Sequence, residues 1–228
     1  MLSLNKNMLW KTEFKTEKTL LKECMEFLEN FSDFKTSLNY PTGNFFYDKW
    51  SVKNEYKNTV FERVLSALPN NIGEARVIKL DSGKCYLQHA DIDDRYHYNL
   101  AGDNSFLVDV DNNCMHELKA DGIWYEMDAG RLHSAINIGL TSRYQIVVRK
   151  LLNNSELENS KNVRITPICE KPRFYFDNLI SPWLNYANKK GIINSFEVEN
   201  SSVKFAIEKN YINELEFIEH NNFIVEIE

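Results

Sequence analysis

The alternation of apolar and polar positions is strongest between Gly83 and Arg149. There the chain divides into short runs in which apolar or aromatic residues recur at every second position. The runs are KCYLQHADID, RYHYNLAG, SFLVDVDN, GIWYEMDAG, RLHSAINIG and SRYQIVVRKLL. Turn-forming residues separate them at Gly102, Asp111–Asn113, Asp121–Gly122 and Gly130. Many short strands at this spacing predict an antiparallel sandwich or barrel rather than a parallel sheet with crossover helices.

Two amphipathic helices are predicted before this region. Residues 15–31 place apolar side chains at helical spacing on one face, and Thr16 stands where an N-cap is expected. Residues 55–67 repeat the pattern and end before Pro69. Both helices are expected to buttress a sheet, and residues 75–80 (ARVIKL) read as its first strand.

The segment between the two helices is rich in aromatic residues. It carries a Pro41–Gly43 turn signal, and we interpret it as loop and short strand. Tyr40, Phe46 and Trp50 have an alternative interpretation as the wall of a substrate entrance.

The pattern changes again after Leu152. Residues 153–162 (NNSELENSKN) are polar and typical of a surface linker. Residues 174–189 predict a helix interrupted near Pro182. Strands are predicted at 195–199, 203–208 and 223–228, with a helix at 211–219. The last third is therefore expected to form a small α+β appendage or a lid.

Composition narrows the class of protein. Hydrophobic residues make up 43% of the 228 positions, which is enough for a buried core, and the net charge is −6. The absence of any block of five basic residues argues against a nucleic-acid or anionic-membrane surface. No segment approaches the ~20 apolar residues of a membrane helix. Four cysteines without a CxxC pair favour reduced thiols in a cytoplasmic protein, with two secreted-type disulfides as the alternative.

The strongest candidates for chemistry are His89, Asp91 and His133. In a strand, positions i and i+2 point to one face, so His89 and Asp91 would project together. That pair alone is a weak signal, because 33 acidic residues give such spacings by chance. His133 lies on a later predicted strand, where its side chain would share a face with Asn137.

Two histidines and one carboxylate form the facial triad of non-haem iron(II) oxygenases, which leaves metal positions open. A structural zinc site would instead have four ligands and would favour cysteine. Asp93 shares the His89 face if the strand continues, so it is a rival ligand. Its alternative interpretation, together with Asp94, is a solvated turn.

Arg143 follows His133 by ten residues, in the strand SRYQIVVR. A turn near Gly139–Thr141 would bring it back beside the metal strand. An arginine that faces an apolar interior needs an anionic partner, and a carboxylate fits its planar fork. That partner is either a bound ligand or an internal Asp or Glu, and Arg143 by itself favours neither.

The ordered set of motifs resembles the aspartyl/asparaginyl β-hydroxylase family. The set is His-x-Asp (89–91), Arg-x-His (95–97), Trp-x-x-x-Asp (124–128), His-Ser-x-x-Asn (133–137) and Arg143, within a stretch from Ile72 to Arg149. The resemblance implies an Fe(II)- and 2-oxoglutarate-dependent oxygenase that consumes O2. It also implies a mainly β fold with a double-stranded β-helix (cupin-like jelly-roll) core.

The resemblance also implies roles for individual residues. His89, Asp91 and His133 would ligate Fe(II), and Arg143 would bind the distal carboxylate of 2-oxoglutarate. His97 and Arg95 would contact the cosubstrate or the substrate. Three residues would support the site, namely Trp124, Asp128 and Asn137. The chain departs from the family pattern at Leu87–Gln88, at Ala129 and in the short spacing between Asp91 and Arg95. We interpret His116, His220, Arg131 and Arg149 as surface, packing or rim residues.

The resulting hypothesis is a hydroxylase acting on an amino-acid side chain, free or in a peptide, with release of succinate and CO2. The alternatives are a cupin-type metalloenzyme without oxygen chemistry and a jelly-roll binding protein without a metal. We predict a jelly-roll domain over residues 1–152 and a C-terminal extension over 153–228. Within the first, flanking helices would occupy 1–72 and the metal-binding core 73–152. The sequence is silent on the oligomeric state and on the identity of the small-molecule or peptide substrate.

Overall fold

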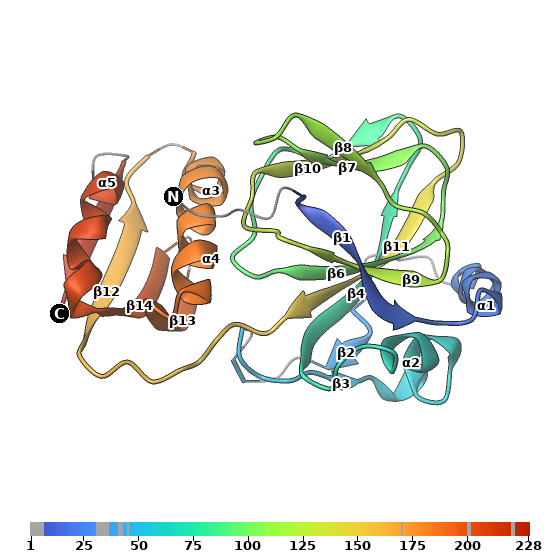
Figure 1. The fold of residues 1–228 in the computed structure, drawn as a ribbon, viewed down its shortest axis with the longest axis horizontal. Coiled ribbons are helices and arrows are strands. Elements are labelled where there is room, and N and C mark those ends of the chain that lie inside the picture. The colour runs from blue at the N-terminus through green and yellow to red at the C-terminus, as the bar shows by residue number, and fades with distance from the viewer. Residues whose placement is uncertain are drawn as a thin grey trace.

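Two antiparallel sheets face each other across the larger lobe of the molecule (Figure 1). The structure, a computed structural model, describes residues 7–30, 37–40, 43–44, 46–169, 171–199, 202–219 and 222–228. The five-stranded sheet has the order β1 (Leu9–Lys15), β9 (Ile123–Met127), β6 (Arg95–Ala101), β11 (Arg143–Lys150) and β4 (Ile72–Leu80). The four-stranded sheet has the order β5 (Lys84–Cys85), β10 (His133–Asn137), β7 (Ser105–Asp109) and β8 (Cys114–Glu117).

The order of the strands defines a jelly-roll. Counted from β4 to β11, the first, eighth, third and sixth strands lie side by side in the larger sheet. The second, seventh, fourth and fifth lie side by side in the smaller sheet. Two interleaved Greek keys produce this order. The predicted mainly β, jelly-roll fold is therefore confirmed. Strand β1, which the sequence analysis did not predict, extends the larger sheet by pairing with β9.

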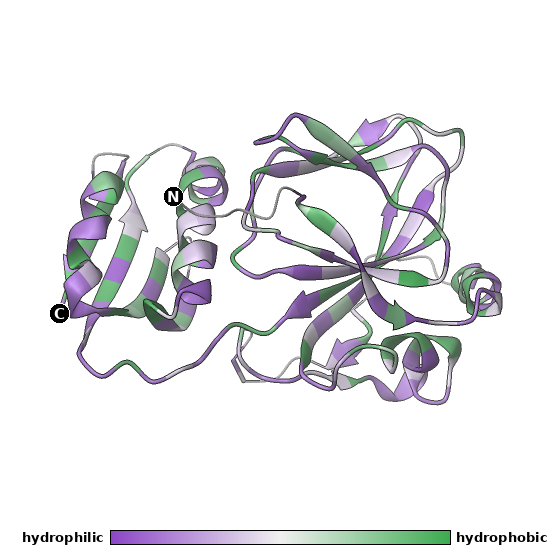
Figure 2. Cartoon of the chain, in the orientation of Figure 1, coloured by the Kyte–Doolittle hydropathy of each residue, from purple (hydrophilic) through white to green (hydrophobic). Residues whose placement is uncertain are grey.

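Strand β6 shows why the alternation of apolar and polar residues is incomplete in the larger sheet. All of its residues except the last are buried. Tyr96, Tyr98 and Leu100 pack outward into a core cluster under the helices. Arg95 and His97 point the other way, into the space between the sheets. Both faces are covered, so hydropathy alone cannot separate the core face from the site face (Figure 2).

The N-terminal helices cover the outer face of the larger sheet, as predicted. They are α1 (Thr19–Leu28) and α2 (Val60–Leu65), joined by β2 (Asn39–Tyr40), β3 (Ser51–Val52) and the 3-10 turn η1 (Asn54–Tyr56). Their apolar faces pack in the same core cluster as β6. The predicted N-cap at Thr16 is wrong, because α1 begins later and the Thr16 hydroxyl bonds the Tyr98 hydroxyl at 2.5 Å. Phe46 and Trp50 are buried, and Phe31 lies outside the described residues.

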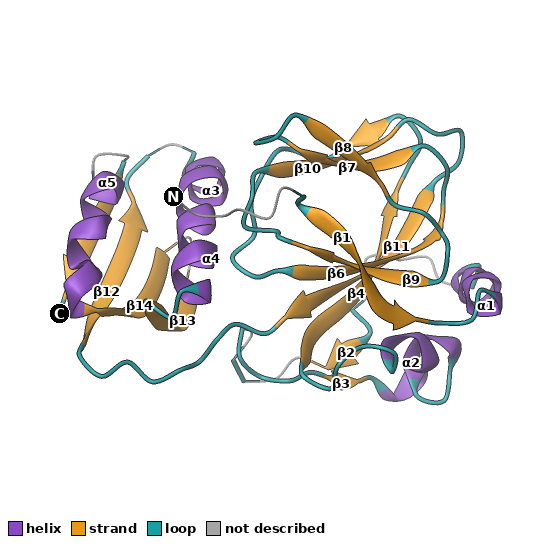
Figure 3. Cartoon of the chain, in the orientation of Figure 1, coloured by secondary structure: helices purple, strands orange, loops and turns teal. Residues whose placement is uncertain are grey.

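The smaller lobe is a second four-stranded sheet flanked by helices (Figure 3). Its strands are β12 (Ser160–Pro167), β13 (Ile193–Glu199), β14 (Ser202–Glu208) and β15 (Phe223–Ile227). Its helices are α3 (Pro172–Tyr175), the π-helix η2 (Phe176–Ile180), α4 (Ser181–Lys189), the 3-10 helix η3 (Lys209–Leu215) and α5 (Glu216–Glu219). Strand β12 was not predicted. The expected helix break is a π turn that ends just before Pro182. The domain boundary at residue 152 stays a prediction.

Two further predictions concern membrane helices and cysteines. Within the described residues, no helix has both the length and the apolar character needed to cross a lipid bilayer. All four cysteines are free thiols, and only Cys24 is buried. The core of the smaller lobe also takes in Phe46 and Ile92 from the first part of the chain. The two lobes are therefore packed against each other next to the loop that carries Asp91.

Candidate metal centre and cofactor pocket

His89 and His133 face each other through a two-residue β-bridge. The His89 N–H donates to the His133 carbonyl at 2.9 Å, and the His133 N–H donates to the His89 carbonyl at 2.8 Å. The ring centroids lie 4.4 Å apart. The expected continuous strand over residues 84–93 is wrong, because β5 ends at Cys85. The bridge, rather than a regular strand, places His89 opposite the first residue of β10.

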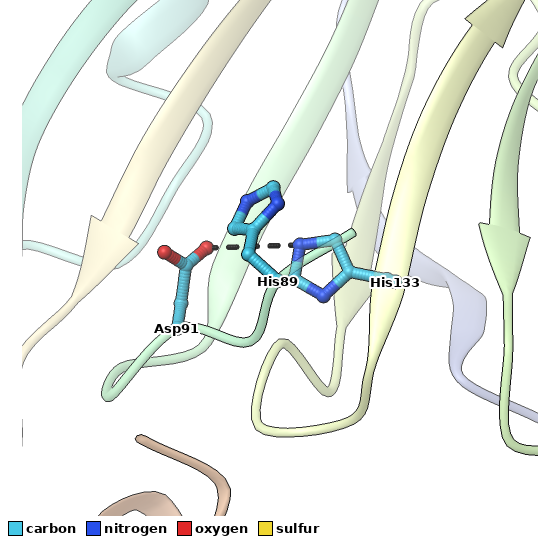
Figure 4. A group of neighbouring side chains, drawn as sticks. All are labelled: His89, Asp91 and His133. Atoms are coloured by element: carbon cyan, nitrogen blue, oxygen red, sulfur yellow. Dashed lines mark ion pairs between the residues drawn. The ribbon is translucent and has the colours of Figure 1, made fainter. Parts of the chain in front are cut away.

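Asp91 completes the group from the loop that follows. Its N–H donates to the carbonyl of Ala129 at 2.8 Å, which ties this loop to the one leading into β10. The carboxylate points toward the two imidazoles, with Oδ2 3.9 Å from Nε2 of His133 (Figure 4). One ligand atom from each of the three residues lies within 4.8 Å of the others. The structure thus brings together the three predicted ligands, while their metal role stays a prediction.

The hydrogen bonds of the two imidazoles set their tautomers. Nδ1 of His89 lies 2.8 Å from the Leu87 carbonyl, and Nδ1 of His133 lies 2.8 Å from the Arg131 carbonyl. A carbonyl only accepts, so each Nδ1 carries a proton, and in the neutral tautomer this leaves the Nε2 lone pair for a metal. Burial lowers the pKa of His133 to about 4, so its ring is neutral at pH 7. Second-shell bonds of this kind orient histidines for metal binding.

The carboxylate of Asp91 stays ionised. Burial alone would raise its pKa, but Arg95 and then the two histidines outweigh burial and lower the pKa to about 2. Two imidazoles and one carboxylate form the donor set that non-haem iron(II) takes, with further coordination positions left to other ligands. The residues therefore fit the predicted metal.

A buried ion-pair network lies beside this group, and we define it as Asp93, Arg95 and Arg149. Arg95 contacts Asp93 and, at 3.2 Å, Oδ1 of Asp91. Arg149 bonds both oxygens of Asp93 through Nη1, at 2.7 and 2.9 Å. All three side chains are at most 15% exposed.

The network corrects three interpretations. Asp93 is neither a rival metal ligand nor part of a solvated turn, because it neutralises two buried arginines. Arg149 is not a rim charge. Arg95 lines the pocket, but its guanidinium is engaged by Asp91 and Asp93, so its predicted contact with the cosubstrate stays a prediction.

Arg143 is buried in the cavity wall, and no ion pair joins it to an acidic residue that the structure describes. Its exposed fraction is 2%, and neither Nε nor Nη1 has a hydrogen-bond partner in the part of the chain that the structure describes. Burial lowers its pKa to about 10, so it keeps its charge at pH 7. The internal salt bridge that was the alternative interpretation of Arg143 is not formed with any described residue. An unpaired buried guanidinium is costly, and a bound anion would remove that cost.

His97 and Gln145 form a second polar group on the same wall. Nε2 of Gln145 lies 2.8 Å from Nδ1 of His97. The amide NH2 donates, so Nδ1 accepts and Nε2 of His97 carries the proton. That Nε2 is buried and has no partner among the described residues. Burial, assisted by Arg143, lowers the pKa of His97 to about 3. Sequence reasoning missed Gln145, although it shares a face of β11 with Arg143.

These residues line one cavity of about 310 Å³ between the two sheets. The metal group lies on its wall together with Arg143, His97 and Gln145. Apolar side chains, among them Leu107, Met127 and Ala135, form the rest of the lining. A small, partly apolar cavity with a few convergent polar groups is typical of a ligand site.

Residues of the smaller lobe bond to the loop that carries Asp91 and to the loop that leads into His133. The Ala90 N–H, between His89 and Asp91, donates to the carbonyl of Asp177 in the π-helix at 2.8 Å. From α4, the Asn185 amide donates to the Ile92 carbonyl at 2.9 Å. Lys189 pairs with Asp94 at 2.8 Å and with Asp128 at 2.6 Å. The sequence analysis assigned no role to these residues.

Gly130 shows how closely α4 approaches the second loop. A Cβ atom at this position would overlap the side chain of Asn185. Only glycine therefore permits the contact that holds the loop leading into His133.

None of the three predicted supporting residues, Trp124, Asp128 and Asn137, lines the cavity, and Asp128 pairs with Arg131 and Lys189. Trp124 is buried in the outer core against Tyr98, with ring centroids 4.9 Å apart. Asn137 holds the turn after β10 through the Leu80 and Thr141 carbonyls, each at 2.9 Å. Arg131 is buried and pairs with Asp109 and Asp128 rather than lying on the rim. His220 lies outside the described residues.

Comparisons with known proteins add little to this geometry. No protein-family model matches the chain, and no curated protein matches it. Among solved structures the chain is similar to a cupin domain from Bordetella pertussis Tohama I, with 16% identity and a TM-score of 0.31. The similarity covers 36% of this chain and 84% of that one. The strand order assigns the jelly-roll without this likeness. The chain thus has a cupin-like jelly-roll fold that carries a candidate His–Asp–His metal site.

Proposed function

We propose that this protein is an Fe(II)- and 2-oxoglutarate-dependent dioxygenase of the aspartyl/asparaginyl β-hydroxylase type. It would hydroxylate an amino-acid side chain, free or within a peptide. The observation that carries the proposal is the presence of the His–Asp–His group and the unpaired, buried Arg143 in one cavity. A metalloenzyme without a keto-acid cosubstrate would have no use for that arginine.

Each residue has a task that follows from its geometry. His89, Asp91 and His133 would hold the iron through two Nε2 atoms and a carboxylate oxygen. Arg143 would bind the distal carboxylate of 2-oxoglutarate through its planar fork. The protonated Nε2 of His97 would donate a hydrogen bond to the same cosubstrate or to the substrate. When bound, iron and 2-oxoglutarate supply the oxidising chemistry, with O2 consumed and succinate and CO2 released.

An anaerobic titration tests the proposal. Addition of Fe(II) and 2-oxoglutarate should produce a weak visible charge-transfer band, which Arg143→Met should lose. Arg63→Ala is the matched control, because Arg63 is an exposed arginine on α2 that pairs with Glu23. Absence of the band in the wild type, or an undiminished band in Arg143→Met, would contradict the assignment. Succinate formation under air then separates an oxygenase from a cupin-type metalloenzyme without oxygen chemistry.

A further inference from the structure

A second cavity, of about 1050 Å³, lies between the larger lobe and α3. It continues into the metal cavity, because Arg76, Tyr86, His89 and Arg173 line both. His89, a candidate metal ligand, thus also lines the larger cavity. A substrate placed there would lie directly beside the proposed iron.

The charge of this larger cavity is positive. Among the described residues, Arg76, Lys171 and Arg173 line it, against one acidic residue, Asp177. A third cavity, of about 660 Å³, borders the site on the Asp91 side, and there the balance is reversed. Its acidic residues are Asp91, Asp93, Asp177, Glu197 and Glu199, and its basic residues are Arg95, Arg149 and Arg173. An anion would therefore be favoured on the His89 side and disfavoured on the other.

Two of the arginines pair with an acid only through Nε, so their Nη atoms are available to bind an anion. Arg173, from α3, contacts Asp177 through Nε at 2.6 Å. Arg76, from β4, contacts Glu74 through Nε at 3.4 Å. Within the described residues, neither has a partner at its Nη atoms. Each acid contacts one edge of a guanidinium, and the Nη atoms stay available to a ligand; the Arg173 side chain is 85% exposed and that of Arg76 is 38% exposed.

Apolar side chains complete the lining, and two of them are exposed. Leu87 is 89% exposed on the loop before His89, and Phe174 is 57% exposed on α3. Ile78, Tyr86 and Pro172 lie between them in the cavity wall. Large apolar side chains that face a cavity from two lobes are expected to bury against a ligand.

From these contacts we infer that the substrate is an organic anion with an apolar body, bound in the larger cavity with its anionic group on Arg173 and Arg76. The inference rests on the proposed function only in calling this ligand the substrate. The anion site itself requires neither iron nor 2-oxoglutarate. Arg173 is therefore a specificity-determining residue that the smaller lobe supplies to the jelly-roll.

Two fluorescent probes test the site on the full chain without added metal. 8-Anilinonaphthalene-1-sulfonate is an apolar anion, and N-phenyl-1-naphthylamine has the same body without the sulfonate. We expect the wild type to bind the anion about tenfold more tightly than the neutral probe, as a charge-assisted contact would require. Equal affinities for the two probes would overturn the inference.

Substitutions then locate the contact. Arg173→Ala and Arg76→Ala should each weaken binding of the anionic probe and leave the neutral probe unchanged. Arg63→Ala should change neither. Phe174→Ser should weaken both probes alike, because it removes apolar wall and no charge. Retained preference for the anion in Arg173→Ala would overturn the role of that residue.

Folding and the proposed function are checked separately. Each variant is compared with the wild type by circular dichroism and thermal midpoint, and Arg173→Lys should keep part of the preference because it keeps the charge. Probe selectivity with no charge-transfer band would support the anion site and reject the oxygenase. A charge-transfer band with no probe selectivity would reject the anion site alone.

Discussion

Two buried, charged regions share the mouth of the jelly-roll, and they differ in how their charges are satisfied. In the ion-pair network, Asp93 neutralises Arg95 and Arg149, with two bonds of 2.7 and 2.9 Å to Arg149. In the metal cavity, Arg143 and the Nε2 of His97 have no partner among the described residues. The regions are neighbours on β6 and β11, so burial and strand position do not explain the difference.

The contrast separates structural charge from charge kept for a ligand. A buried charge whose partner is part of the chain stabilises the fold only as a complete set, and removal of one member is costly. A buried charge without a partner destabilises the empty protein and is relieved on binding. Replacement of an arginine by methionine should therefore lower the stability of the protein in the ion-pair network and raise it in the metal cavity.

The largest expected effect is a loss of stability when the anion shared within the ion-pair network is removed. Asp93→Asn removes the anion that two buried guanidinium groups share, and leaves Arg95 with Asp91 and Arg149 with Glu74. It should lower the free energy of unfolding by up to about 3–5 kcal/mol. Urea unfolding measures this change. Asp81→Asn, which alters an exposed pair with Lys79, should stay within about 0.5 kcal/mol of the wild type. A loss below about 1 kcal/mol for Asp93→Asn would show that the network is not structural.

The next effect concerns metal affinity. His133→Ala removes one of three donors and should weaken Co(II) binding, followed by its visible absorption, by at least about 100-fold, or ~2.7 kcal/mol. His116 lies outside the His–Asp–His group, so His116→Ala is the matched control. Equal affinities of these two variants would remove His133 from the metal site.

Arg143→Met should act in the opposite direction on stability. It replaces an unpaired buried cation with an apolar side chain of similar length, so the free energy of unfolding should rise by about 1–3 kcal/mol. Arg95→Met is the comparison within the network, and it should lower stability because Asp93 loses a partner. If both variants are destabilised alike, the distinction between the two regions fails.

The smallest expected effect is a pH dependence that arises in the cavity. Burial lowers the pKa of His97 in the folded protein to about 3, below its ordinary value of 6.5, so the unfolded chain binds the proton first as the pH falls. The contribution to stability is therefore full above pH 6.5 and declines as the pH falls toward 3. Between pH 7.5 and 5.5 this group should cost about 1 kcal/mol, measured by urea unfolding. His97→Gln should reduce the slope, and an unchanged slope would contradict the assignment.

Local patterns predicted the fold well where one face of an element is buried. The two N-terminal helices and most strands of residues 95–150 follow from side-chain spacing, and their apolar faces meet in the expected core. Strands β1, β8 and β12 were missed. Their polar positions alternate with few strongly apolar residues, and pairing with β9, β7 and β14 stabilises them. The π turn in η2 also has no local signal that we recognised.

Strand periodicity predicted a sandwich or barrel, and residue chemistry singled out His89, Asp91, His133 and Arg143, because both are local properties; the jelly-roll followed from the resemblance in the order of the motifs. The tertiary structure decided which charges are paired. Asp93 and Arg143 both read as candidates for the site, yet Asp93 is enclosed by two arginines, whereas no ion pair joins Arg143 to an acid among the described residues. Coulombic pairing depends on distances of a few ångströms between residues far apart in the chain, so no local pattern can fix it.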